Sequence, residues 1–475
     1  MSRPLAAFLP CGAIRDLWNN IRARGRNLWA NHRRLTIGVA AGLVVAAVAG
    51  ALVAYNALKR PGDKSCPAPC TLTATTPQPV SGLTNWPVYG LNAQRTRYLD
   101  APDVKPPFSI RWRFKGRNLL EYSPVLVGNQ IFGVNNNGMA FAIKASTGKA
   151  RWKQQIAHLN ASSPTFSEHV IYVSNLEPGQ VVALAQSDGQ ILWKHPLPGR
   201  SESSPLVVGN KVIVGCECNT VYALDKATGK TIWERHVNGA VKAAPAYENG
   251  IVYIGDYSGE MNAIRAGDGS IKWQTGSQGS GFGRSGRFYA AATVAYGRVY
   301  AGNVDGRMYS FDQQTGDLVW SHSTGNYVYA AAIAARTPDT PPTIYFGSYD
   351  GTFYALDART GEERWSVPNL GAISGAASLI GDTAYVADLK TTSTYGFDVR
   401  NGHRVFQYSD GAYNPVISNG KELLLTGYKT LYALRPGIGP AKDGILQNQP
   451  KAPAPSGQAT TATTPGQQKK PKKSK

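Results

Sequence analysis

Histidine and cysteine are scarce in this 475-residue chain, with seven and five copies respectively. The histidines form no Ser/His/Asp arrangement and show no metal-ligand spacing, so nothing indicates a hydrolytic triad or a histidine metal centre. No Gly-Lys-Ser/Thr triplet follows the glycine-rich stretch 276–286, and no helix start follows it, so it is not a phosphate loop. We interpret it as a loop that displays Arg284 and Arg287. We therefore predict no catalytic residue and no metal ligand.

The five cysteines are spread over three parts of the chain. Cys66 and Cys70 lie four residues apart, so an oxidising compartment would allow a small disulfide loop, whereas a metal site would need two more ligands nearby. Cys216 and Cys218 have one residue between them, and we expect a disulfide there to be strained and the thiols to be reduced or purely structural. A lone leader cysteine such as Cys11 is more often unmodified than palmitoylated. No cysteine follows a lipobox-like sequence, so a lipid anchor is not indicated.

Negative charge is also in short supply, because 30 acidic residues stand against 50 basic ones and give a formal net charge of +20. Residues 1–35 and residues 441–475 each carry a net +6, which leaves +8 for the residues between them. The central part is therefore mildly basic, and nucleic-acid binding is not predicted. Residues 437–475 are rich in Pro, Ala and Thr, end in a run of lysines and are expected to be disordered. These lysines either bind anionic wall polymers or lipid head groups, or only keep the chain soluble.

Only one long hydrophobic run is present, the uncharged stretch Thr36–Tyr55. Its length suits a membrane-crossing helix, which we place at residues 36–58. The leader 1–35 carries most of the flanking arginines, so the amino terminus is predicted to be cytoplasmic and the rest of the chain extracytoplasmic. A cleaved signal peptide ending near Ala51 is the alternative. The leader is either a basic amphipathic helix or a solvated positive segment, and residues 59–85 form a Pro/Thr-rich spacer.

What the chain does have is a repeat. Residues 223–233 read Ala-Leu-Asp-Lys-Ala-Thr-Gly-Lys-Thr-Ile-Trp, and a small residue, a glycine and a tryptophan recur at these offsets every 40 to 47 residues. A period of about 40 residues with strand-like segments between turn signals is typical of a propeller, in which each blade is a four-stranded antiparallel sheet. One small sheet cannot cover an indole, so we expect each to dock on the neighbouring blade near its repeat glycine. The docking residues are Trp112, Trp152, Trp193, Trp233, Trp273, Trp320 and Trp365.

The two ends of the repeat region complete each other. Residues 110–112 read as a return strand without a preceding turn of its own, and residues 431–434 read as the missing opposite half. Together with Phe406, which stands in place of an eighth tryptophan, the repeats give eight return strands. We therefore predict an all-β, eight-bladed propeller at residues 86–436, closed by its N-terminal strand, because closure removes the open edge of a linear array.

The pattern Ala-x-Asp-x-x-x-Gly-x-x-x-Trp resembles the tryptophan-docking motif of propellers related to pyrroloquinoline quinone (PQQ) dehydrogenases, a superfamily that also holds the BamB-type outer-membrane assembly lipoproteins. The resemblance covers roughly residues 86–435, with Lys144, Ala185 and Arg265 replacing the aspartate in three copies. It supports the fold and leaves the function open, because the superfamily mixes enzymes with scaffolds. Residues 86–97 resemble the lead-in before the first full blade, and we expect them to pack across the propeller rather than to bind a ligand.

Polar and aromatic residues precede the innermost strands, whose own small residues suit the crowding around a central axis. If the strands run as in other propellers, these residues ring the channel mouth, on the face shared with Cys216–Cys218 and the loop 276–286. A polar rim is the default ligand site of a propeller, although many rims are merely solvated. The candidate ligand-binding residues are Glu121, Tyr122, Asn160, Glu202, Lys242, Tyr289, Tyr329, Tyr413 and Asn414.

For an enzyme, the resemblance implies PQQ with a calcium ion held by carboxylate and amide oxygens, a general-base aspartate and, in many members, a disulfide between adjacent cysteines. The chain has no adjacent cysteine pair and no clear aspartate set near the rim. We therefore expect no cofactor and a non-catalytic, membrane-tethered scaffold that binds envelope proteins or anionic wall polymers. The alternative is an oxidoreductase that depends on PQQ and Ca²⁺, or a sensor that binds a small ligand in the channel.

Overall fold

The computed structural model describes residues 80–81, 85–279, 286–413 and 416–437. The predicted leader, membrane span and C-terminal tail lie outside the described residues, as do most of the spacer, the Cys66 and Cys70 pair, and Asn414. Within the described ranges, no helix has the length and apolarity needed to cross a membrane.

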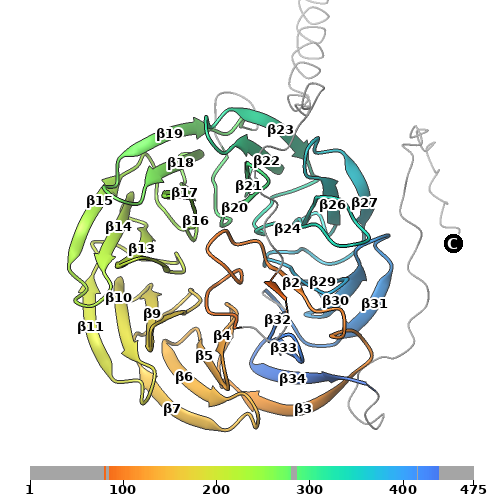
Figure 1. Ribbon diagram of the computed structural model, residues 1–475, viewed down its shortest axis with the longest axis horizontal. Coiled ribbons are helices and arrows are strands. Elements are labelled where there is room, and N and C mark those ends of the chain that lie inside the picture. Colours follow the sequence, from red (N-terminus) through yellow and green to blue (C-terminus); the bar gives the residue numbers. More distant parts are fainter. Residues whose placement is uncertain (1–79, 82–84, 280–285, 414–415, 438–475) are drawn as a thin grey trace, which may run out of the picture. The chain divides into compact units, whose positions relative to one another are not determined.

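Eight four-stranded antiparallel sheets surround a central axis, which confirms the predicted eight-bladed propeller (Figure 1). Blades 1 to 4 follow one another in the chain, each beginning with its innermost strand. Their strands are β4 (Val125–Val127), β5 (Gln130–Val134), β6 (Met139–Lys144) and β7 (Ala150–Gln155); β8 (Thr165–Ser167), β9 (Val170–Asn175), β10 (Gln180–Ala185) and β11 (Ile191–Pro196); β12 (Leu206–Val208), β13 (Lys211–Cys216), β14 (Thr220–Asp225) and β15 (Thr231–His236); and β16 (Ala246–Glu248), β17 (Ile251–Gly255), β18 (Glu260–Arg265) and β19 (Ile271–Gly276).

Blades 5 to 8 continue the order, and blade 8 takes its outermost strand from the N-terminal side of the chain. Their strands are β20 (Thr293–Ala295), β21 (Arg298–Asn303), β22 (Arg307–Asp312) and β23 (Leu318–Ser323); β24 (Ile333–Ala335), β25 (Thr343–Gly347), β26 (Phe353–Asp357) and β27 (Glu363–Val367); β28 (Ser378–Ile380), β29 (Thr383–Ala387), β30 (Thr394–Asp398) and β31 (Arg404–Tyr408); and β32 (Val416–Ser418), β33 (Leu423–Thr426), β34 (Thr430–Pro436) and β3 (Phe108–Lys115). Two short strands, β1 (Val80–Ser81) and β2 (Tyr98–Asp100), extend blade 7 at its inner edge in parallel pairing.

The burial of each strand depends on how much of it the two neighbouring blades cover. In blade 3, the middle strands β13 and β14 are buried at nearly every position, because a neighbouring blade covers each face. The outermost strand β15 keeps Trp233 buried and exposes residues on both sides of it. This change from continuous to alternating burial is expected where only one face of a strand is covered.

The ring is closed by pairing between the two ends of the described chain. Strand β3 pairs antiparallel with β34, from Phe108 opposite Pro436 to Lys115 opposite Thr430. This confirms the predicted closure, because blade 8 takes its fourth strand from the N-terminal side of the chain.

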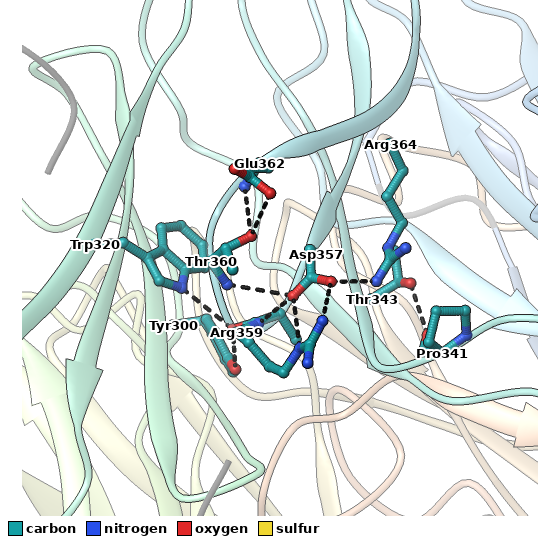
Figure 2. Close-up of polar contacts among 10 residues, drawn as sticks. Tyr300, Trp320, Pro341, Thr343, Asp357, Arg359, Thr360, Glu362 and Arg364 are labelled. Atoms are coloured by element: carbon teal, nitrogen blue, oxygen red, sulfur yellow. Dashed lines mark hydrogen bonds and ion pairs between the residues drawn. The ribbon is translucent and has the colours of Figure 1, made fainter. Parts of the chain in front are cut away.

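A docking turn in each of blades 1 to 7 contacts the blade before it, and Figure 2 shows the turn of blade 6 that contacts blade 5. The Trp320 indole Nε1 of blade 5 donates a hydrogen bond of 3.2 Å to the carbonyl of Ala358, which lies in the turn between β26 and β27. A Cβ atom added to Gly361 in that turn would lie 2.7 Å from the Trp320 ring, and the φ of Gly361 is +77°. Glycine is therefore required both by the backbone conformation and by the close approach of the indole.

The same geometry recurs at all seven docking tryptophans. Each indole Nε1 donates to a turn carbonyl of the next blade over 2.8–3.2 Å. Phe406 in blade 7 packs edge-to-face on Phe108 instead, with ring centroids 5.6 Å apart. Blade 8 is assembled from β34 and the distant β3, so no short turn connects these strands and no turn carbonyl is there to receive an indole N–H.

The lead-in of residues 86–97 lies inside the ring and packs across the propeller, as the sequence predicts (Figure 1). Its backbone carbonyls accept hydrogen bonds from the innermost strands of blades 1, 2 and 4 to 7. Examples are Phe166 N to Pro87 O at 2.8 Å, Val294 N to Gln94 O at 2.9 Å and Leu379 N to Arg97 O at 2.9 Å. The lead-in therefore links blades that lie far apart in the sequence.

Candidate functional site

Two kinds of connection lie on one face of the propeller, which we call the mouth face. They are the loops from the outermost strand of one blade to the innermost strand of the next, and the turns between the second and third strands of each blade. A small axial cavity of about 50 Å³ opens among the first kind. It brings together seven of the nine residues predicted from the sequence: Glu121, Tyr122, Glu202, Lys242, Tyr289, Tyr329 and Tyr413.

Asn160 does not line this cavity. It is 2% exposed, and its Nδ2 donates to the carbonyl of Ser162 over 3.1 Å. Its backbone N–H donates to the carbonyl of Asn136 over 2.8 Å. The side chain therefore stabilises its own loop. The position of Asn160 before an innermost strand could not show this role.

A line of polar contacts runs from the cavity towards blade 3. The Tyr289 hydroxyl donates to one oxygen of Glu202 over 2.8 Å, and Lys242 Nζ donates to the other over 2.5 Å. Lys242 also forms an ion pair with Glu217 at 3.3 Å. Burial alone would lower the pKa of Lys242, but the hydrogen bond and charge of Glu202, joined by Glu217, raise it above its ordinary value. The lysine thus offsets carboxylates that would otherwise repel each other.

The surroundings of two groups in the cavity raise their pKa values. Burial, followed by the charge of Glu202, raises the pKa of Glu121, although a hydrogen bond from Asn136 acts in the opposite direction. Burial, and then Glu202, also raises the pKa of Tyr122 well above its ordinary value. These side chains can therefore donate protons in hydrogen bonds over a wider pH range than they would in water.

A wider depression of about 460 Å³ shares Glu121, Glu202 and Lys242 with the axial cavity. Five of its lining residues are tyrosines, and neighbouring ring centroids among them lie 5.0–6.4 Å apart in a continuous series. The side chain of one of them, Tyr327, is 45% exposed. We call this group the tyrosine rim, and its members are Tyr257, Tyr289, Tyr327, Tyr329 and Tyr349.

The sequence prediction missed three members of the rim. Tyr257 and Tyr349 occupy the turn after the second strand of blades 4 and 6, within the similar sequences Gly-Asp-Tyr-Ser-Gly and Gly-Ser-Tyr-Asp-Gly. Tyr327 lies two residues before the predicted Tyr329. The repeated Tyr-x-Gly turn two blades apart was the available signal, since such turns share a face with the loops before the innermost strands.

Cys216 and Cys218 form a disulfide, so the expectation of reduced thiols was wrong. They flank the turn between β13 and β14, which brings their Cα atoms to 5.0 Å, within the usual range for a disulfide. The residue between them is Glu217, which reaches Lys242. Neither cysteine lines the axial cavity or the depression. The disulfide therefore shapes the turn that presents Glu217 rather than forming a wall of the site.

The floor of the axial cavity comes from the lead-in, whose Tyr89 is a lining residue. The guanidinium of Arg97 lies 4.2 Å from the centroid of the Tyr89 ring, and both Arg97 and Arg95 are fully buried. Arg95 donates to the carbonyl of Pro245 over 2.9 Å, and to that of Tyr89. Burial, and then the charge of Arg97, lowers the pKa of Arg95 to about 9. The lead-in is thus fixed by charge-assisted hydrogen bonds and a cation–π contact.

The residues around the mouth do not fit the calcium and PQQ that the resemblance implies for an enzyme. Among the residues that the structure describes, no three His, Cys, Asp or Glu side chains are grouped as metal ligands. The axial cavity of about 50 Å³ is far smaller than the roughly 300–1,000 Å³ of typical small-molecule sites. The disulfide present lies outside it.

The closed ring of eight blades with tryptophan-docking turns defines a repeat β-propeller. A family model described as "Outer membrane protein assembly factor BamB" matches residues 109–237 and 179–408, more than half of the chain, and the chain belongs to this family.

Solved structures with the same fold include a BamB protein and dehydrogenases. BamB from Moraxella catarrhalis is 18% identical, with 69% of this chain and 100% of that chain covered and a TM-score of 0.59. A europium-containing methanol dehydrogenase is 14% identical, with 74% and 98% covered and a TM-score of 0.63. Quinohemoprotein alcohol dehydrogenase from Comamonas testosteroni is 12% identical, with 77% and 82% covered and a TM-score of 0.63. Identities this low establish the fold alone.

One curated protein is similar over a shorter stretch. Tetrathionate hydrolase from Acidithiobacillus ferrooxidans is 33% identical over 95 residues, which are 20% of this chain. The match spans 19% of the length of the hydrolase, so it covers about a fifth of either protein.

Proposed function

We propose that this chain is a non-catalytic scaffold, tethered to the cytoplasmic membrane by residues 36–58, whose propeller binds envelope proteins or wall polymers on the outer side. The arginine-rich leader and the uncharged stretch after it support this topology. Membership of the BamB family supports a role in binding partners in general.

The observation that carries the proposal is the tyrosine rim on the mouth face. Tyrosine combines a large apolar ring with a hydroxyl and is enriched among the residues that dominate binding interfaces. Tyr327 is 45% exposed beside a depression of about 460 Å³, and it packs on Tyr329 and Tyr349. The rim therefore offers an ordered aromatic surface with charged and amide groups next to it.

A small-ligand sensor or a quinoprotein oxidoreductase is the second candidate. Glu121 favours it, because a carboxyl group with a raised pKa facing an axial cavity is a common feature of functional sites. Adding PQQ and Ca²⁺ to the purified full-length protein separates the two candidates. The scaffold proposal expects an unchanged melting temperature, and a saturable rise of several degrees would favour the oxidoreductase.

The proposed location has its own test. Protease added to intact spheroplasts should digest the propeller and leave a short membrane-anchored fragment. A propeller that stays protected until the membrane is permeabilised would show that the orientation is wrong.

A further inference from the structure

We infer that the depression framed by the tyrosine rim binds neutral saccharide residues of an envelope polymer. This inference rests on the proposed function, because it takes the mouth face as the binding surface and names the ligand class.

The rim is arranged before any ligand arrives. Tyr329 packs edge-on against Tyr289 with an interplanar angle of 86°, and against Tyr349 with an angle of 68°. Tyr327 contacts Tyr329 at 5.7 Å between ring centroids, with an interplanar angle of 73°. Edge-to-face contacts of this kind are favourable and fix ring orientation. A ligand would therefore meet positioned rings and would order few side chains on binding.

A cationic ligand is disfavoured by charges already at the rim. The Tyr257 ring faces Lys242 Nζ at 5.6 Å and the Arg287 guanidinium at 5.3 Å. Aromatic rings attract ammonium groups through the ring face, but here two protein cations already approach that ring. A quaternary ammonium or a lysine side chain would be repelled by both.

An anionic ligand is disfavoured by the carboxylates below the rim. Glu121 and Glu202 both line the depression. Lys242 lies 2.5 Å from Glu202 and 3.3 Å from Glu217, so its charge is already shared between two carboxylates. A sulfate, phosphate or uronate group placed beside these carboxylates would meet like charge, and the charge of Lys242 is already offset. The guanidinium of Arg287 lies at the Tyr257 ring, so the anionic probe in the test below measures whether it attracts an anion.

A neutral polyhydroxylated ligand matches the aromatic rings and hydrogen-bonding groups that line the depression. A sugar ring has apolar C–H faces that can stack on aromatic rings, and hydroxyl groups at its edge that both donate and accept hydrogen bonds. Around the rim, the depression presents the carboxylates of Glu121 and Glu202, the Asn136 amide and the Ser374 hydroxyl. Its volume of about 460 Å³ lies within the roughly 300–1,000 Å³ range of small-molecule sites. A short segment of a glycan chain would fit this combination of size and chemistry.

The test uses the full-length protein in a detergent without a sugar head group, with binding followed by calorimetry. The neutral probes are cellohexaose and tetra-N-acetylchitotetraose, the anionic probe is polygalacturonate, and the cationic probes are choline and a chitosan oligosaccharide. We expect saturable binding of at least one neutral probe and weaker or no binding of the charged probes. Binding of neither neutral probe, or preference for a charged one, would overturn the inference.

Variants then locate the binding. Tyr327→Ala and Tyr349→Ala should weaken binding about five- to tenfold through the lost ring contact, whereas Tyr327→Phe should retain it. The matched control is Tyr428→Ala, because Tyr428 is 43% exposed and lines neither the cavity nor the depression. Unchanged melting temperatures would show that the variants are folded. An equal loss with Tyr428→Ala, or no loss with either rim variant, would contradict the assignment.

The outcome can be told apart from failure of the proposed function. A protected propeller in spheroplasts would refute the proposed location even if the purified protein binds a saccharide. An exposed propeller that binds no saccharide would refute only the present inference, and binding of an envelope protein at the rim would then replace it.

Discussion

At each docking turn, a glycine of one blade meets the indole of the blade before it. Gly361 lies so close to the Trp320 ring that a Cβ atom would stand 2.7 Å from it. Gly250 also has a positive φ, +84°, but nothing lies within 4 Å of the position its Cβ would take. Replacing each glycine by alanine would therefore separate two contributions to the loss of stability: the strained backbone conformation, present at both positions, and steric overlap with the indole, present only at Gly361.

We predict that Gly361→Ala lowers the free energy of unfolding by about 2–4 kcal/mol, because left-handed backbone strain and overpacking add. Gly250→Ala should lose only the backbone share, about 1–2 kcal/mol. Urea denaturation of the two variants and the natural protein measures both effects. Equal losses would show that the indole yields easily and that docking does not require the glycine.

Glu121 gives a pH-dependent prediction. Burial and the charge of Glu202 raise the pKa of this carboxyl in the folded protein above its ordinary value of 4.5. A raised carboxyl pKa destabilises the fold at pH values above it, where the group must ionise in the folded state, and has no effect where it is protonated in both states. Glu121→Gln should therefore stabilise the protein at about pH 7.5 and change little at about pH 4. A melting temperature that is unchanged or lower at the higher pH would contradict this.

At the scale of the element, the turn between β13 and β14 depends on the disulfide between Cys216 and Cys218. Alkylation of the unfolded, unreduced protein followed by mass spectrometry should leave both cysteines of that peptide unlabelled and two hydrogens short. Reduction before alkylation should label both. Full labelling without a reductant would show that the thiols are free.

The repeat made the blades predictable, because each blade carries its own glycine and tryptophan at fixed offsets. The closure by β3 followed from the same pattern, since residues 110–112 and 431–434 each held half of a blade. The turns of the mouth face follow the repeat less closely, and the Tyr-x-Gly turn of Tyr257 and Tyr349 is shared by blades 4 and 6, so these tyrosines were missed. The disulfide was rejected because a single residue between two cysteines suggested strain. Asn160 was misplaced because sequence position alone cannot tell a lining side chain from one that supports a loop.

At the scale of the whole molecule, two features stabilise the ring: the pairing of β3 with β34 and the lead-in that packs inside it. The β3–β34 pairing joins the ends of the described chain, and the lead-in contacts the innermost strands of most blades. A ring held in both ways keeps the tyrosine rim, contributed by blades 4 to 6 and their connecting loops, in one arrangement. The axial cavity measures only about 50 Å³, so the proposed binding is expected at the surface of the mouth rather than in a deep channel.

The central claim is that the mouth face meets an envelope partner, and photo-crosslinking in intact cells tests it most directly. A photo-reactive phenylalanine analogue would replace Tyr327 in one variant and Val405 in the control, because the two residues are almost equally exposed and Val405 lies on the outermost strand of blade 7. The account predicts covalent products with envelope proteins or glycans from position 327 and far fewer from position 405. Products with cytosolic proteins alone, or equal products from both positions, would contradict it.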